Sequence, residues 1–247
     1  MNVFRKAWME SRSRLAWAGS MIFFLLLLHV TEGRWLVGSG ANDAATAAKL
    51  RRIVDIGAGS GYEWWQAIYN MVAAPVAIFI GFLMAGSGLN TQTLYGVGQG
   101  VHPSMVFTLS LPVRRRTWVL TRAGLGLLQA ALMTVAALAL PPALNGVLGT
   151  KFSWMTALGA VPAMVAGMAV FYWFSVFLAT FLDELWQGMV SLVVLGMLTG
   201  FGVAVKAGSL NYMKFMTGGG AVGYTVCLGL SLALAYGSVT VVERREF

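Results

Sequence analysis

Charged side chains are scarce in this sequence. Only 11% of its 247 residues are Asp, Glu, Lys or Arg, whereas 58% are hydrophobic. Soluble domains carry about 25% charged residues, and a soluble fold of this length could not remove so much apolar surface from water. The composition excludes a disordered chain, a nucleic-acid-binding domain and a disulfide scaffold. It indicates a membrane protein that crosses the bilayer several times.

Cysteine is almost absent, because Cys227 is the only one in the chain. A single thiol cannot form an internal disulfide, and no second cysteine could share a metal site with it. Cys227 lies inside a long apolar run, residues 224–235. We therefore expect it to be a small, buried packing residue.

Motifs for nucleotide binding and hydrolysis are also missing. No glycine is followed by lysine, which excludes the G-x-x-x-x-G-K-[ST] loop that binds nucleotide phosphates. Neither H-E-x-x-H nor G-x-S-x-G occurs, and His29 and His102 are expected on opposite sides of the membrane. An enzyme would have to use Asp183, Glu184 and Arg122, which supply neither a nucleophile nor a metal set. We expect no catalytic residue, metal or cofactor in this chain.

Long apolar runs are what the sequence has in abundance. Six of them are close to the 20 or so residues that a spanning helix needs. They cover residues 15–30, 66–88, 118–140, 155–182, 185–205 and 219–242. The fold class predicted from them is an all-α integral membrane protein, with residues 1–247 forming a single transmembrane domain. We expect Pro141-Pro142 to close the third run.

The fourth and fifth runs are separated only by Asp183-Glu184. Adjacent carboxylates are costly in lipid, so they indicate a tight turn at the water interface. The alternative is one long, broken segment, which would change the number of spans.

Lysine and arginine placement predicts the orientation, because cytoplasmic loops carry more of these residues. With six spans both termini share a side. That side would hold ten of the 17 basic residues, namely Arg5, Lys6, Arg12, Arg14, Arg114, Arg115, Arg116, Arg122, Arg244 and Arg245. The other side would hold seven. We therefore place both termini in the cytoplasm. The chain itself is expected in the plasma membrane, which in a bacterium is the inner membrane.

Two short amphipathic segments are expected outside the spans. Residues 1–14 place Phe4 and Trp8 in one helical arc, opposite Arg5 and Lys6. This pattern is typical of a helix that lies in the membrane interface, as an anchor or as a lever that also touches a cytoplasmic partner. Within the outer loop, 31–65, a second such helix would cover the membrane surface.

The loop between the second and third runs, residues 88–116, is expected in the cytoplasm. It contains a partly apolar stretch, 104–111, that is too short to span the membrane and is followed by Pro112. A short apolar helix needs a surface to bury against, either the membrane interface or a partner protein. Arg114, Arg115 and Arg116 come next, and a positive-inside anchor alone would explain them.

These two cytoplasmic stretches resemble the permease subunits of type-2 ABC transporters. The motif Phe107-Thr-Leu-Ser-Leu-Pro-Val-Arg-Arg-Arg116, running into Trp118-Val-Leu-Thr-Arg122, is similar to a leucine-serine-leucine-proline-valine signature of that family. The opening Phe4-Arg-Lys-Ala-Trp-Met-Glu-Ser-Arg-Ser-Arg14 resembles the family's basic and aromatic N-terminus. Residues 90–103 depart from the pattern, because they contain no acid where many members have several.

The resemblance implies a partnership and a site. Two six-span subunits, identical or different, would sit on two ATP-binding subunits, which would bind the ATP that this chain does not. The short coupling helix would dock into the ATP-binding subunit through Phe107, Leu109, Leu111 and Pro112. Arg114, Arg115 and Arg116 would hold it against headgroups or acidic groups. A second contact would use Arg5, Lys6 and Glu10.

The expected function is therefore a permease subunit of an ATP-driven ABC transporter, an exporter for an apolar or amphipathic cargo such as a lipid, drug or peptide. The alternatives are a membrane scaffold or accessory subunit without transport activity, and a membrane enzyme. The spans hold almost no charge, which argues against an ion-coupled carrier.

Overall fold

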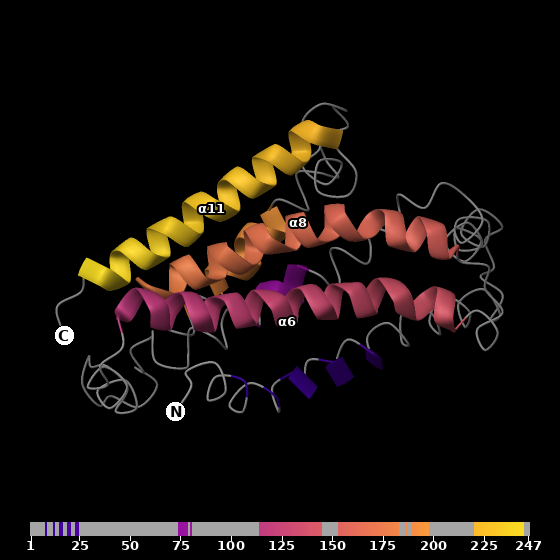
Figure 1. Ribbon diagram of the computed structural model, residues 1–247, viewed down its shortest axis with the longest axis horizontal. Helices are drawn as coiled ribbons and strands as arrows, with labels where there is room; N and C mark the ends of the chain where they lie inside the picture. Colours follow the sequence, from indigo (N-terminus) through magenta and orange to yellow (C-terminus); the bar gives the residue numbers. More distant parts are fainter. Residues whose placement is uncertain are drawn as a thin grey trace, which may run out of the picture.

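The computed structural model describes three long helices (Figure 1). They are α6 (Arg115–Ala143), α8 (Trp154–Ala179) and α11 (Gly220–Arg244). The residues described are 8, 12, 15–16, 19–20, 23–24, 74–78, 80, 114–144, 153–182, 186, 189–197 and 220–244.

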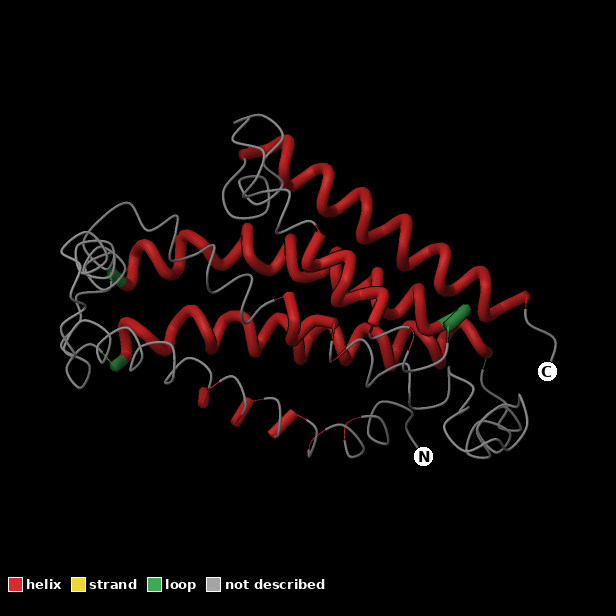
Figure 2. The backbone as a smooth tube through the Cα atoms, turned by 180° about the vertical axis from the view of Figure 1, so that it is seen from behind, coloured by secondary structure: helices red, strands yellow, loops and turns green. Residues whose placement is uncertain are grey.

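Every element in this described part of the chain is helical (Figure 2), as the all-α prediction requires. Three helices are long and apolar enough to cross a membrane, with 28, 26 and 24 residues in their candidate spans. They match the expected third, fourth and sixth runs. The remaining runs, 15–30, 66–88 and 185–205, are described only in part. Their described residues are helical, and six spans remains a prediction.

The central helix is α8, which packs against both α6 and α11. It contains no charged residue between Trp154 and Ala179, and it is apolar all round. A helix of this kind is suited to contacts on several sides. Of its most apolar stretch 56% is buried, against 44% for α6 and 28% for α11. The other two helices therefore keep a larger share of their surface for lipid.

The directions of the helices constrain the path of the chain (Figure 1). α6 begins at the end of the bundle where α8 and α11 finish, so α8 and α11 run in the same direction. The connection between them has to return along the bundle, in agreement with an intervening expected span, 185–205. The described residues 186 and 189–197 are helical.

The boundaries of α6 differ from the expected run, 118–140. The helix begins at Arg115, and Pro141 and Pro142 lie inside its last turn instead of closing it. Each proline removes one backbone N–H, and its ring crowds the carbonyl four residues earlier, so the pair weakens the helix where it is about to end. The helix ends when the Leu144 N–H donates to the carbonyls of Leu140 and Pro141, at 3.0 and 3.2 Å.

The fourth run also ends earlier than expected. α8 stops at Ala179, and residues 180–182 form a turn. The Phe181 and Leu182 N–H groups both donate to the Leu178 carbonyl, at 2.9 and 2.8 Å. The turn immediately precedes Asp183-Glu184, which lies outside the described residues.

Two buried side-chain hydrogen bonds tie α8 to its neighbours. The Tyr172 hydroxyl donates to the Ala123 carbonyl of α6 at 2.6 Å, and the Ser175 hydroxyl donates to the Ile78 carbonyl at 3.0 Å. Bonds of this kind between helices hold membrane bundles together where the hydrophobic effect does not act. They fix how α8 faces α6 and residues 74–80.

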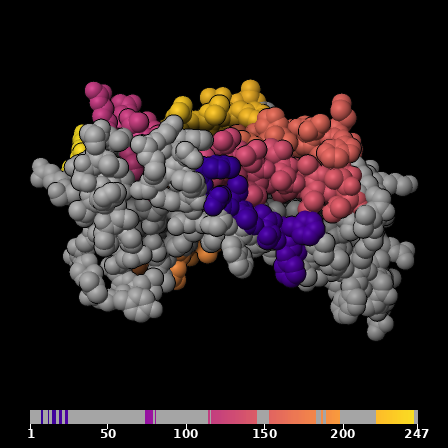
Figure 3. Space-filling model, turned by 60° about the horizontal axis from the view of Figure 1, so that its bottom comes forward, coloured from indigo at the N-terminus to yellow at the C-terminus, as the bar shows by residue number. Residues whose placement is uncertain are grey.

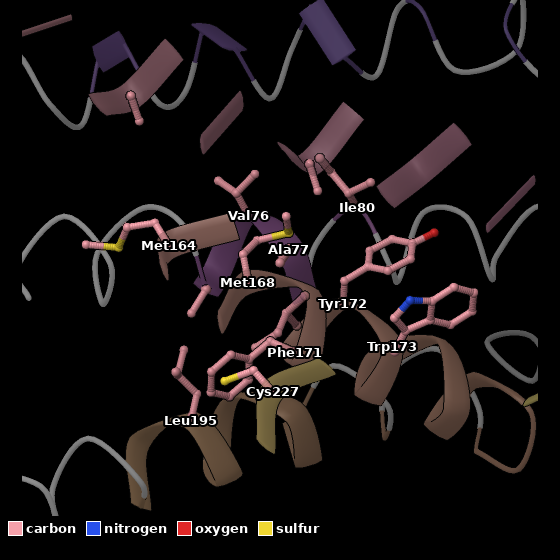
Figure 4. Close-up of a cluster of buried hydrophobic side chains, with 14 of the residues drawn as sticks. Val76, Ala77, Ile80, Met164, Met168, Phe171, Tyr172, Trp173, Leu195 and Cys227 are labelled. Carbon is pink, nitrogen blue, oxygen red and sulfur yellow. The ribbon is translucent and has the colours of Figure 1, made fainter. Parts of the chain in front are cut away.

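A cluster of buried side chains fills the space around α8 (Figure 4). Met168, Phe171 and Tyr172 stand at its centre, and Leu195 and Cys227 reach it from other helices. Cys227 is only 4% exposed, which confirms the prediction that it is a buried packing residue.

The first apolar run lies against α6. A Cβ added at Gly19 would approach the Met133 terminal carbon to 3.3 Å. Figure 3 shows the described residues of this run crossing the surface of α6. They run in the same direction as α6 (Figure 1). The expected orientations of the first and third runs are also the same.

At Gly237, α11 packs tightly against Phe177 of α8. A Cβ at this position would lie 3.0 Å from the Phe177 ring, whereas a Cβ at Gly229, on the same helix, would meet nothing within 4 Å. We expect Gly237→Ala to be less stable than Gly229→Ala by about 1–2 kcal/mol, because inserting a methyl group into a packed contact forces the two helices apart. Thermal unfolding in nanodiscs measures the difference. Equal midpoints for the two variants would contradict this packing.

The Tyr172 hydroxyl bond offers a second test. We expect Tyr172→Phe to lower the free energy of unfolding by about 1 kcal/mol, because α8 then loses its hydrogen bond to α6. Tyr236→Phe is the matched control, since the Tyr236 side chain is 74% exposed on α11. A titration with a denaturing detergent compares the two. If both variants had the same free energy of unfolding as the native chain, the hydrogen bond would not contribute to stability.

Candidate functional site

The predicted coupling residues fall mostly outside the described part of the chain. Phe107, Leu109, Leu111 and Pro112 lie there, and so does the predicted second contact, made of Arg5, Lys6 and Glu10. The structure therefore does not test how these side chains are arranged. It does describe the backbone of the arginine run that follows them.

The arginine run starts α6. Arg114 has extended backbone, with φ −59° and ψ 130°, and its carbonyl accepts the Trp118 N–H at 3.1 Å. Arg115 and Arg116 are in the first helical turn, although we expected all three arginines to precede the span. Arg114 and Arg116 are exposed.

Positive charge at this position is unfavourable within the helix itself. The N-terminus of a helix carries a partial positive charge, which favours acidic residues, and the first turn of α6 contains none. Local helix electrostatics therefore do not account for the arginines. Anionic groups outside the helix would account for them, either lipid headgroups or acidic side chains of a partner.

The exposed arginines gather at one end of the bundle. Arg114 and Arg116 stand where α6 begins, and Arg244 lies in the last turn of α11, whose C-terminus is at the same end (Figure 1). At the opposite end α8 begins with exposed Trp154 and Met155. No charged residue lies at that end among the residues that the structure describes. The three arginines therefore share one end of the bundle, as expected from the sequence, and the cytoplasmic location of that end stays a prediction.

Arg122 is a buried arginine that the sequence placed among the charges near a span end and among the few candidate residues of an enzyme. It lies seven residues into α6, about 10 Å from the start of the helix, and is only 6% exposed. Its guanidinium carbon stands 4.7 Å from the centre of the Trp118 ring. A cation over an aromatic ring is stabilised by the ring's negative face, more strongly when water is excluded. The i, i+4 spacing of these residues was the available signal.

Two further polar side chains are buried on α6. Gln129 and Thr134 are buried on α6, and the Thr134 hydroxyl donates to the Ala130 carbonyl at 2.9 Å. No group of three His, Cys, Asp or Glu side chains that could hold a metal occurs in the described ranges. The arrangement is suited to packing helices and to holding a cation near one face of the bundle.

Comparisons with known proteins give this chain no relative: no family model, no curated protein and no solved structure matches it. Function has to be argued from the residues of this chain alone.

Arg122 and Arg116 provide a matched pair on α6. We expect Arg122→Gln to lower stability by about 1–2 kcal/mol, because the ring contact and the packing of the buried side chain are lost. Arg116→Gln, at an exposed position, should change it by less than about 0.5 kcal/mol. Tryptophan fluorescence during unfolding follows both. If Arg122→Gln were as stable as Arg116→Gln, the contact with Trp118 would have no structural role.

Proposed function

We propose that this chain is the transmembrane permease subunit of an ATP-driven ABC transporter, working as an exporter in the plasma membrane. Three observations support the proposal. The described helices are apolar enough to span a membrane, the chain lacks a nucleotide-binding loop, and exposed arginines gather at one end of the bundle.

The observation that carries the proposal is the start of α6. The Leu109-Ser-Leu-Pro112 motif is separated by a single residue from Arg114, at the exposed N-terminus of a long apolar helix. A short apolar element tied so closely to a spanning helix can transmit a push from a cytoplasmic partner to the membrane. The basic end of α6 attracts acidic surfaces, since it has no acidic residue of its own in the first turn.

In this proposal Phe107, Leu109, Leu111 and Pro112 form the docking element, which binds a groove of the ATP-binding subunit. Arg114, Arg115 and Arg116 contact headgroups or acidic groups beside it. The N-terminal helix adds Arg5, Lys6 and Glu10. A second permease subunit, a copy or a homologue, completes the transporter, and both termini lie in the cytoplasm.

The cargo proposed is apolar or amphipathic. α8 carries no charge, and the exposed surface of α11 is made largely of apolar side chains, among them Val222, Leu228 and Leu232. A small, highly charged solute would find little to replace its water of hydration on such surfaces.

Co-purification from the native host is the direct test of the partnership. We expect the tagged full-length chain to retain a subunit that contains a G-x-x-x-x-G-K-[ST] loop and hydrolyses ATP. Leu111→Glu should abolish the co-purification, because a carboxylate would have to be buried in an apolar groove. Ser110→Glu is the control, since it places the same charge at a position of the motif that is already polar.

Two results would overturn the proposal. One is a purified membrane complex with no ATP-hydrolysing subunit, which would favour a scaffold or accessory role. The other is a complex that Leu111→Glu leaves intact.

A further inference from the structure

Two buried serine hydroxyls lack a partner. Ser191 is 0% exposed and Ser231 is 7% exposed, and the hydroxyl oxygen of each has no hydrogen-bond partner in the described part of the chain. Six buried serines and threonines are described in all. The other four each donate a hydrogen bond to a backbone carbonyl; they are Thr134, Ser175, Thr180 and Ser238.

The two exceptions point into the same part of the core. Ser191 is one helical turn before Leu195, and Ser231 is one turn after Cys227. Leu195 and Cys227 belong to one buried cluster with Phe171 (Figure 4). Residues four apart share a helix face, so both hydroxyls lie on faces that are turned to this cluster.

The register brings them to the same level of the bundle. α8 ends at residue 179, and Leu195 packs near Phe171, two turns back along α8, so residues 189–197 run opposite to α8. α11 runs in the same direction as α8. Going backward from Leu195 and forward from Cys227 therefore leads to the same end of the bundle. We name the sides of residues 189–197 and of α11 that face this cluster the serine seam.

A dry, unpaired hydroxyl is costly in an apolar interior, and each one in a native protein calls for an explanation, such as a second state in which it is hydrated. The hydroxyl oxygens of the seam are fully enclosed, with almost no surface for a water molecule. The packed arrangement therefore excludes water from the very groups that need it. If residues 189–197 separated from α11, both hydroxyls could bind water. Their hydration would offset part of the packing energy that the separation costs.

We propose that the serine seam opens to water and that the arrangement described here is its closed state. The two hydroxyls lower the stability of the closed state relative to an open one. The open seam would present polar groups along a path between two helices that are otherwise apolar. This property belongs to the chain itself and does not depend on a partner ATPase.

Cys227 is a natural reporter of this opening. It is the only thiol in the chain, it is 4% exposed, and it lies one turn from Ser231 on the same face. The rate at which N-ethylmaleimide modifies Cys227 in the full-length chain, in nanodiscs without partner, measures how often the seam opens. Mass spectrometry of the intact protein measures the fraction that has been modified.

We expect the double variant Ser191→Ala/Ser231→Ala to react about ten-fold more slowly than the native chain, because an alanine seam gains nothing from water and stays closed. Its thermal midpoint should be higher than that of the native chain. Ser238→Ala is the control on α11: its native hydroxyl is paired to the Leu234 carbonyl at 2.8 Å, so the variant should not react more slowly.

Three results would overturn the proposal. The first is a native Cys227 that does not react while the chain is folded. The second is a double variant that reacts as fast as the native chain or unfolds at a lower temperature. The third is a Ser231→Ala variant with the same effects as Ser238→Ala, which would show that Ser231 is simply paired within its own helix. Failure of the ATPase to co-purify would leave all three measurements unchanged, so the two proposals fail separately.

Discussion

Hydrocarbon offers no hydrogen-bond partner, and this constraint shapes the described bundle more than any other. Helices satisfy their own backbone, so side-chain polar groups on buried faces must find partners inside the protein. Tyr172 binds a carbonyl of α6, and Ser175 binds the Ile78 carbonyl. The buried guanidinium of Arg122 lies over Trp118. Each contact also fixes how two elements face each other or how a charge is held. At the serine seam two buried hydroxyls do not meet this constraint.

In the three long helices every charged residue lies at or near one end of the bundle. α6 begins with exposed arginines that its own N-terminus disfavours, so water or anionic groups outside the helix stabilise them. That end is also where α8 and α11 finish (Figure 1). The Tyr172 hydrogen bond joins α8 to α6, which starts at this end. The apolar centre, by contrast, is built for packing and for contact with lipid.

The three described long helices could be predicted from apolar run length alone, because length and hydropathy decide which segments can cross a bilayer. Their exact ends could not. Pro141 and Pro142 remain inside α6, where they remove two N–H donors just before the helix ends at Ala143. The burial of Arg122 was also missed: a charge near a span end reads as interfacial until the neighbouring helix is placed against it. Cys227 was predicted correctly, because its whole surrounding run is apolar. The coupling residues were predicted from the sequence motif alone, and most of them lie outside the described residues.

The orientation of the bundle is the central claim, and single-cysteine labelling tests it most directly. In a Cys227→Ser background, a cysteine would replace either Arg244, at the end of α11, or Met155, which is 82% exposed at the start of α8. A membrane-impermeant maleimide would be applied to right-side-out and inside-out vesicles. The account predicts that Met155→Cys is labelled only in right-side-out vesicles and Arg244→Cys only in inside-out vesicles. Labelling of both positions from the same side would contradict it.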